Sequence, residues 1–169
     1  MSQEPDWSLV DKPAKRAPSG DGPVGLGGWL ILPVFGIIST IFLTLPQLWA
    51  YKDVVEAWSY FTGGQQAFVT VDFIVGSMVG VLTPIALLYF FFKRSEIFPG
   101  LYISWAIAVP IYLTLEAFFY GVAMADLMEP GEQAFDGETT KAIIRGAVQA
   151  LIWGLYMERS KRVANTFVN

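Results

Sequence analysis

The sequence predicts an all-α protein, an integral membrane bundle of four transmembrane helices with both termini in the cytoplasm. Three observations lead to this fold class. Charged residues make up 15% of the 169-residue chain, against about 25% in ordinary soluble domains. Long apolar stretches follow one another along the chain, and the basic residues gather beside alternate connections. Alternating β patterns are absent, which disfavours a membrane barrel.

The first 25 residues form a polar tail, rich in Pro and Gly, that we expect to be disordered and cytoplasmic. The tail is too mixed in charge for a signal-peptide leader, and the apolar run after it is too long for a signal core. We therefore expect this run to be retained as the first span. Residues 26–169 would form a single transmembrane domain.

Four apolar stretches are the candidate spans, at about residues 26–49, 71–92, 99–124 and 140–157. The first contains no charge and is long enough to cross a hydrocarbon core about 30 Å thick. The fourth is the weakest, because it contains Lys141 and Arg145. Prolines fall inside several stretches, but membrane helices tolerate them because neighbouring groups satisfy the freed backbone.

The first connection contains apolar residues at a helical spacing, namely Val54, Val55, Trp58 and Phe61, followed by Gly63 and Gly64. This pattern fits a short helix lying on the outer leaflet and a plain loop equally well. Polar aromatic rings prefer the membrane interfaces. We expect Tyr102 and Trp105 near the inner interface and Tyr51 near the outer one.

The orientation follows from the basic residues. If all four stretches cross the membrane, eight of the eleven Lys and Arg residues lie on one side of it. These are Lys12, Lys15, Arg16, Lys93, Arg94, Arg159, Lys161 and Arg162. The connection before the fourth span carries five acids and no base. Because basic loops stay cytoplasmic, both ends are predicted inside. The inner basic residues could also bind anionic lipid headgroups, although we favour a role in anchoring the topology.

The composition excludes several classes of function. Without Cys or His, the chain has no thiolate metal site and lacks the commonest metal ligand. We expect no metal, no cofactor and no catalytic residue, because no nucleophile–base pair is visible. A net charge of −4 gives no sign of a nucleic-acid partner. The expected partners are the lipid bilayer and other membrane proteins or a second copy.

The most informative polar residues are Asp72, Glu116, Arg145 and Gln149, which form a candidate intramembrane polar cluster. A carboxylate at the depth of Glu116 needs a partner. We predict an ion pair with Arg145 on the next helix, Asp72 as a shallower third member and Gln149 one turn from Arg145. The cluster has two possible roles. We favour a structural role, in which it fixes the register of the helices, and the alternative is a proton or ion relay.

Small residues recur at four-residue spacing on the second and fourth stretches, namely Gly76 and Gly80, then Gly146, Ala150 and Gly154. Such rows place small side chains on one helix face and let backbones approach closely. Packing within one bundle is the favoured interpretation. A homodimer seam is the alternative.

Two parts of the chain resemble a bacterial family of small four-span inner-membrane proteins, the domain of unknown function 2569 family. The first is Gly27-Gly28-Trp29-Leu30; the closing part comprises Ile152-Trp153-Gly154-Leu155-Tyr156, Ser160-Lys161-Arg162-Val163 and Thr166-Phe167. Gly154-Leu155 and Ala164 depart from the family, which tends toward Ile-Pro and Lys there. The resemblance covers residues 26–169 and implies four spans in the same orientation, but no reaction or ligand.

The leading functional hypothesis is a non-catalytic accessory or interaction protein of the bacterial inner membrane. The alternative is a small oligomeric transporter or channel with a polar path at Glu116 and Arg145. One four-span subunit offers little room for a water-lined route, which favours the first.

Overall fold

The computed structural model describes residues 22–169, which form helices and connections without a strand. The all-α prediction is confirmed for this part of the chain. The longer elements are α1 (Ile31–Glu56), α2 (Gly63–Ser77), the π-helical turn η4 (Met78–Leu82), α3 (Thr83–Phe92), α4 (Phe98–Ala123) and α5 (Gly137–Arg159). Short turns η2 (Gly28–Leu30), η3 (Trp58–Tyr60) and η5 (Ala125–Leu127) and the helix α6 (Lys161–Thr166) complete the chain.

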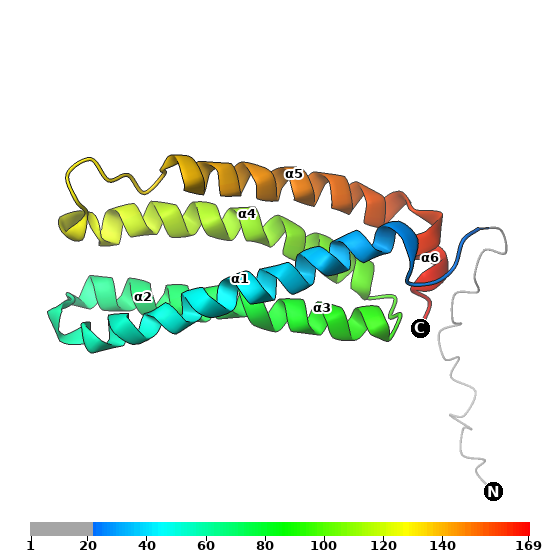
Figure 1. Cartoon of the computed structure of the whole chain (residues 1–169), viewed down its shortest axis with the longest axis horizontal. Coiled ribbons are helices and arrows are strands. Elements are labelled where there is room, and N and C mark those ends of the chain that lie inside the picture. Colours follow the sequence, from blue (N-terminus) through cyan, green and yellow to red (C-terminus); the bar gives the residue numbers. More distant parts are fainter. Residues whose placement is uncertain (1–21) are drawn as a thin grey trace, which may run out of the picture.

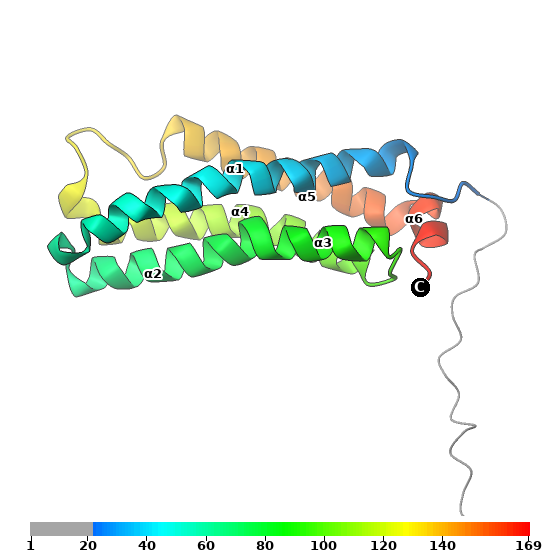
Figure 2. The same ribbon diagram turned by 60° about the horizontal axis from the view of Figure 1, so that its bottom comes forward.

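The helices run lengthwise through an elongated bundle (Figures 1 and 2). Helices α2 and α3 are joined through η4 into one rod, α1 crosses this rod, and α5 lies antiparallel along α4. Helix α6 folds back at the end of the bundle where α1 begins (Figure 1). The start of the described chain and its C-terminus therefore share one end.

Three helices are long and apolar enough to cross a membrane. They are Gly28–Glu56 and Gly63–Phe92, each containing an 18-residue stretch with a mean hydropathy of 2.1, and Phe98–Ala123, in which the corresponding value is 1.6. Their surfaces expose many large apolar side chains, including Phe42 and Leu43, as expected where lipid is the surrounding solvent. Helix α5 is not among the three, because its first turns carry Glu138, Lys141 and Arg145.

The first two helices extend beyond the predicted spans, and a separate surface helix between them is not formed. Val54 and Val55 lie in the last turns of α1, and η3 is only one turn long. Helix α2 begins early because Thr62 caps it. The Thr62 hydroxyl accepts from the Gln65 backbone N–H at 3.4 Å, and the Gln65 side chain accepts from the Thr62 N–H at 2.9 Å. This reciprocal capping box is visible in the sequence.

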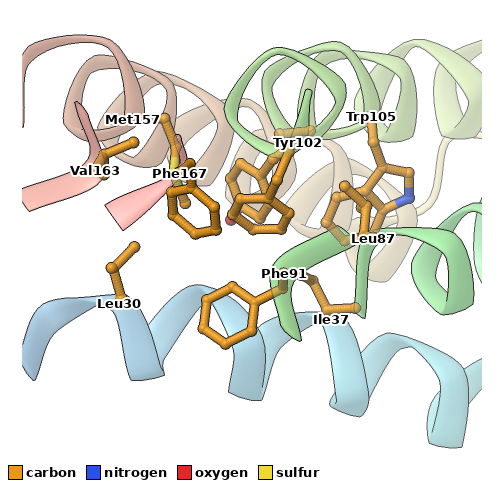
Figure 3. Close-up of a cluster of buried hydrophobic side chains, with 11 residues drawn as sticks. Leu30, Ile37, Leu87, Phe91, Tyr102, Trp105, Met157, Val163 and Phe167 are labelled. Carbon is orange, nitrogen blue, oxygen red and sulfur yellow. The ribbon is translucent and has the colours of Figure 1, made fainter. Parts of the chain in front are cut away.

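The buried core lies at the end where the termini meet (Figure 3). It includes Leu30 of η2, Ile37 of α1, Leu87 and Phe91 of α3, and Met157, Val163 and Phe167 near the C-terminus. The Phe167 ring stacks on Phe98 with centroids 4.7 Å apart. Tyr102 and Trp105, which we expected at the lipid interface, are buried in this core. Helix packing therefore overrides the interfacial preference of these two rings.

The π-helical turn leaves the Val79 carbonyl without a donor from its own helix, and the Trp105 side chain donates a hydrogen bond to it. In η4 the Thr83 N–H donates to Met78 O, five residues back. The next donor in this series would be residue 84, which is proline and has no N–H. The Trp105 Nε1–H donates instead to Val79 O at 2.8 Å. A carbonyl that the helix leaves free is thus satisfied by a neighbouring helix, as a buried polar group in lipid requires.

Hydrogen bonds join the two ends of the described chain in a terminal clasp, formed by Gly25, Gly27, Gly28, Arg162 and Thr166. Gly25 N–H donates to Thr166 Oγ1 at 3.0 Å, and the Thr166 hydroxyl lies 3.4 Å from Gly25 O. Arg162 Nη1 donates to Gly27 O at 3.0 Å. Gly28 has a φ of +66°, and a Cβ there would approach the Arg162 guanidinium carbon at 3.2 Å.

The predicted disordered tail comprises residues 1–25, and residues 1–21 of it lie outside the part of the chain that the structure describes. Its last residue, Gly25, belongs to the terminal clasp. The clasp is extended by the connection between α3 and α4, where Glu96 N–H donates to Asn169 O at 3.0 Å and Asn169 N–H donates to Arg94 O at 3.3 Å. Three segments far apart in sequence therefore close this end of the bundle.

Candidate functional site

Asp72 is the centre of a polar cluster that links three helices. Its carboxylate accepts hydrogen bonds from the Tyr51 hydroxyl of α1 and, at 2.9 Å, from the Tyr112 hydroxyl of α4. Asp72 itself lies on α2, about 13 Å along the helix from Gly63 at 1.5 Å per residue. It therefore lies further from the start of its helix than a span beginning near residue 71 would place it. We call Tyr51, Asp72, Tyr112 and Glu116 the Asp72 cluster.

Gly76 makes the link between Asp72 and Tyr112 sterically feasible. It lies one turn after Asp72 on α2 and is buried. A Cβ at this position would approach the Tyr112 hydroxyl oxygen at 2.8 Å, closer than ordinary contact. The missing side chain leaves the space in which the Tyr112 hydroxyl reaches the carboxylate. Gly76 and the half-buried Asp72 therefore contribute to the same contact between α2 and α4.

Glu116 lies one turn after Tyr112 on α4 and is half-buried. Because residues four positions apart share a helix face, its carboxyl group lies on the side of α4 from which Tyr112 reaches Asp72. Within residues 22–169, Glu116 forms no hydrogen bond and no ion pair. The cluster therefore combines a carboxylate held by two tyrosines with a second carboxyl group that has no protein partner.

The expected ion pair between Glu116 and Arg145 is absent from the described part of the chain, where the ion pairs are Lys52–Glu56 and Lys141–Glu138. The helix rotations explain this. Helices α4 and α5 contact each other at Pro110 and Gly146, and we call this line of contact the α4–α5 seam. A Cβ added to Gly146 would lie 3.5 Å from the Pro110 Cβ. At about 100° per residue, Glu116 lies about 240° around α4 from Pro110 and Arg145 about 100° around α5 from Gly146. Neither side chain lies on the seam.

Gln149 is exposed one turn from Arg145, which is also exposed. These two residues share one flank of α5, but they do not join the Asp72 cluster. Of the four residues predicted for the intramembrane cluster, the structure brings Asp72 and Glu116 together. It leaves Arg145 and Gln149 on the outer flank of another helix.

The small-residue rows face neighbouring helices of the same chain. Gly80 faces Thr44 of α1, whose Cγ2 would lie 2.5 Å from an added Cβ, and Gly76 faces Tyr112 of α4. On α5, Gly146 packs on Pro110 of α4. Gly154 is different, because a Cβ there would meet no atom within 4 Å. The α5 row therefore ends in open space.

That open space is part of an apolar groove between α4 and α5 with a volume of about 680 Å³. One wall comes from α4 and the other from α5, where Ala147, Ala150 and Gly154 contribute little bulk. Glu158 lies at the end of the groove nearest the terminal clasp. We call this the α4–α5 groove; its lining residues are Ile103, Ile107, Pro110, Ile111, Thr114, Leu115, Ile143, Ala147, Ala150, Leu151, Gly154, Leu155 and Glu158.

The chemistry available to the Asp72 cluster is hydrogen bonding and proton exchange among carboxyl and phenol groups. Within residues 22–169, no group of three acidic, His or Cys side chains has an arrangement that could hold a metal ion. Because both tyrosines donate to Asp72, the cluster links α1 and α4 to α2. Sequence reasoning missed the two tyrosines. Tyr112, one turn before Glu116, is the signal that could have revealed one of them.

Comparison with known proteins identifies one relationship. The family described as "Protein of unknown function (DUF2569)" matches residues 23–168, which is nearly the whole chain and includes both segments of the terminal clasp. No curated protein and no solved structure matches the chain.

Proposed function

The chain belongs to the DUF2569 family of unknown function, and we propose that it is a four-span protein of the bacterial inner membrane that acts without catalysis, as an accessory or interaction protein. Both termini lie in the cytoplasm in this proposal. The observation that carries the topology is the terminal clasp. It holds the segment before the first span against the segment after α5.

The clasp supports an even number of crossings, because it holds the two ends of the described chain on the same side. If α1, the α2–α3 rod and α4 each cross the bilayer, the end of α4 lies opposite the clasp. Helix α5 then has to return the chain, and it lies antiparallel along α4 (Figure 1). Its 23 residues correspond to about 35 Å at 1.5 Å per residue. This length is sufficient for the hydrocarbon core, so α5 is the proposed fourth span.

The charge distribution supports the orientation. Lys93, Arg94, Arg159, Lys161 and Arg162 lie at the clasp end, in or beside the connection after α3 and around α6. At the opposite end, the connection between α4 and α5 contains Asp126, Glu129, Glu132 and Asp136 without a base. Basic residues beside spans favour the cytoplasmic side.

The Asp72 cluster supports a non-catalytic role. Its part-buried hydrogen bonds run between helices, as does the bond from Trp105 to Val79 O. Groups that hold one helix against another define a rigid scaffold. A protein of this kind binds other membrane components through its lipid-facing surfaces and its two ends, and it does not provide a reaction site.

Two experiments test this proposal. Single cysteines introduced in place of Gly27 and Asn169, in a chain without natural Cys, should be protected from a membrane-impermeant maleimide in intact cells and labelled after the membrane is opened. A cysteine in place of Gly131, in the acidic connection, should react in intact cells. The role is tested by cross-linking in membranes with a photoreactive residue in place of Phe42, which is exposed on α1. Reaction of the Asn169→Cys variant from outside would refute the topology, and absence of any protein adduct would refute the role.

A second candidate function is a small oligomeric transporter or channel, and the unpartnered carboxyl group of Glu116 favours it. Glu116→Gln should then abolish proton or cation flux into vesicles that contain the purified protein, because the neutral side chain cannot exchange a proton. Glu96→Gln, in the α3–α4 connection, is the matched control. Equal flux in both variants and in empty vesicles would eliminate this candidate.

A further inference from the structure

We infer that the α4–α5 groove is a binding site for one phospholipid, with an acyl chain along the groove and an ammonium headgroup at Glu158. This inference rests on the proposed topology, which places the groove in the bilayer. The site is built by the small side chains of α5, because Gly154 meets no atom within 4 Å even with a Cβ added.

The lining selects an apolar occupant. Twelve of the thirteen residues around the groove carry no charge, and most are aliphatic. From Ile103 to Leu115 the groove extends about 18 Å at 1.5 Å per residue. This is slightly more than one leaflet of a hydrocarbon core about 30 Å thick, which suits a single acyl chain.

Charge complementarity identifies the headgroup. Glu158 is the one ionisable residue of the lining, and it lies at the clasp end of α5, which is the inner interface in the proposed topology. Within residues 22–169, Glu158 forms no hydrogen bond or ion pair. A primary ammonium group, as in an ethanolamine phospholipid, satisfies this carboxylate. Arg159 is exposed at the same depth, where the headgroup phosphate lies.

The occupant is a lipid rather than a second copy because of the shape of the groove and the position of its charge. A second copy would have to align an apolar helix such as α3, whose exposed face ends at Lys93, with its cation at Glu158. An ethanolamine phospholipid combines an acyl chain and an ammonium group in one small molecule and needs no such alignment.

The test uses the full chain, purified in mild detergent and depleted of lipid. Phosphatidylethanolamine, phosphatidylcholine or phosphatidylglycerol is then added, and native mass spectrometry counts the lipids retained on each chain. We expect one retained phosphatidylethanolamine. Gly154→Leu should lose it, because the new side chain fills the groove. Gly36→Leu is the matched control, since Gly36 also meets nothing within 4 Å but lies on α1, outside the groove.

The headgroup contact is tested separately. Glu158→Gln should retain a lipid but lose about tenfold in its preference for phosphatidylethanolamine over phosphatidylglycerol, the change expected for about 1.4 kcal/mol. Ala147→Leu fills the same groove from another turn and provides a second test if Gly154→Leu reduces the yield of folded protein. Retention of the lipid by both folded groove variants would overturn the inference.

The remaining outcomes separate this inference from the proposed function. A dimeric mass that is lost in Gly154→Leu would show that a second copy fills the groove, and it would overturn the lipid assignment. A chain that alkaline carbonate extracts from membranes would refute the proposed topology itself. A carbonate-resistant chain with equal lipid retention in all variants would refute only the groove inference.

Discussion

Individual side chains explain how polar groups are accommodated between apolar helices. Asp72 is satisfied by two tyrosine hydroxyls, and Gly76 provides the space for one of them. A carboxylate in a membrane-spanning segment is destabilising unless it is paired or hydrogen-bonded. The pair of phenols achieves this without a cation. Gly76, one turn from Asp72, is therefore important because it has no side chain to block the Tyr112 hydroxyl.

This steric relationship predicts a coupled pair of variants. Gly76→Ala should destabilise the protein by about 1–3 kcal/mol, because the added methyl group displaces the Tyr112 hydroxyl from Asp72. In a Tyr112→Phe background the same substitution should have a much smaller effect, since the clashing oxygen is gone. A double-mutant cycle of thermal unfolding in detergent measures the coupling. Gly36→Ala, at an open position on α1, is the control. Additive effects of the two substitutions would contradict the packing described.

At the scale of the elements, the α2–α3 rod shows how a local irregularity is stabilised by a neighbour. Pro84 cannot donate to Val79 O, and the π-helical turn leaves that carbonyl to Trp105 of α4. Irregular backbone inside a membrane helix is tolerated only where other groups satisfy it. The proline and the tryptophan, distant in sequence, therefore form one structural unit.

Trp105→Phe tests this unit. It keeps an aromatic ring but removes the donor, and we expect a loss of about 1–3 kcal/mol in the free energy of unfolding because Val79 O becomes an unsatisfied buried acceptor. Adding Pro84→Ala supplies a backbone N–H at position 84 and should recover part of that loss. Thermal unfolding of both variants in detergent is the measurement. No recovery in the double variant would show that the tryptophan stabilises the rod through packing alone.

The start of α5 depends on pH through its N-cap. Thr139 N–H donates to Asp136 Oδ1 at 2.7 Å, and this bond lowers the pKa of the Asp136 carboxyl below its ordinary value of 3.8. Because the folded pKa is lowered, the stabilisation is fully present above pH 3.8 and is lost as the pH falls through the lower, folded value.

We therefore expect amide hydrogen exchange in the first turn of α5 to accelerate on acidification, after correction for intrinsic exchange rates. The acceleration should begin only below the ordinary aspartate pKa. Asp136→Asn keeps an accepting oxygen and should abolish this pH dependence. If the asparagine variant accelerates in the same pH range as the wild type, another group controls the fraying.

At the scale of the whole molecule, the terminal clasp determines how the bundle closes. Thr166 is buried and bonds Gly25 through one hydroxyl, while Phe167 stacks on Phe98 beside it. The first and last segments of the described chain are therefore fixed against each other. This contact links the two parts of the sequence that carry the family resemblance.

Thr166→Val preserves the shape of the side chain and removes the hydroxyl. We expect a loss of about 1–3 kcal/mol, because the Gly25 N–H is left without its acceptor. Thr40→Val is the matched control, since the Thr40 hydroxyl bonds Gly36 O within its own helix and should change stability little. The difference in unfolding temperature between the two variants measures the clasp. Equal temperatures would mean that Phe167 alone holds the C-terminus.

The amino-acid sequence by itself was sufficient for the all-α class, the three apolar helices that are long enough to span a membrane, and the family. These properties depend on composition and on the length of apolar stretches, which are local. The same local signals left open whether the first connection contains a surface helix. In the structure α1 continues to Glu56 and the Thr62 capping box starts α2, so little of the connection remains. The fourth span stays a prediction, supported by the clasp.

The partner of each polar residue was decided only by the tertiary structure. Glu116 and Arg145 have complementary charges and similar expected depths, yet both lie off the α4–α5 seam that Pro110 and Gly146 define. Asp72 instead meets Tyr51 and Tyr112. The physical reason is that a shift of one residue rotates a helix face by about 100°. The rotation of each helix is selected by the packing of all its neighbours together, which no single segment of sequence encodes.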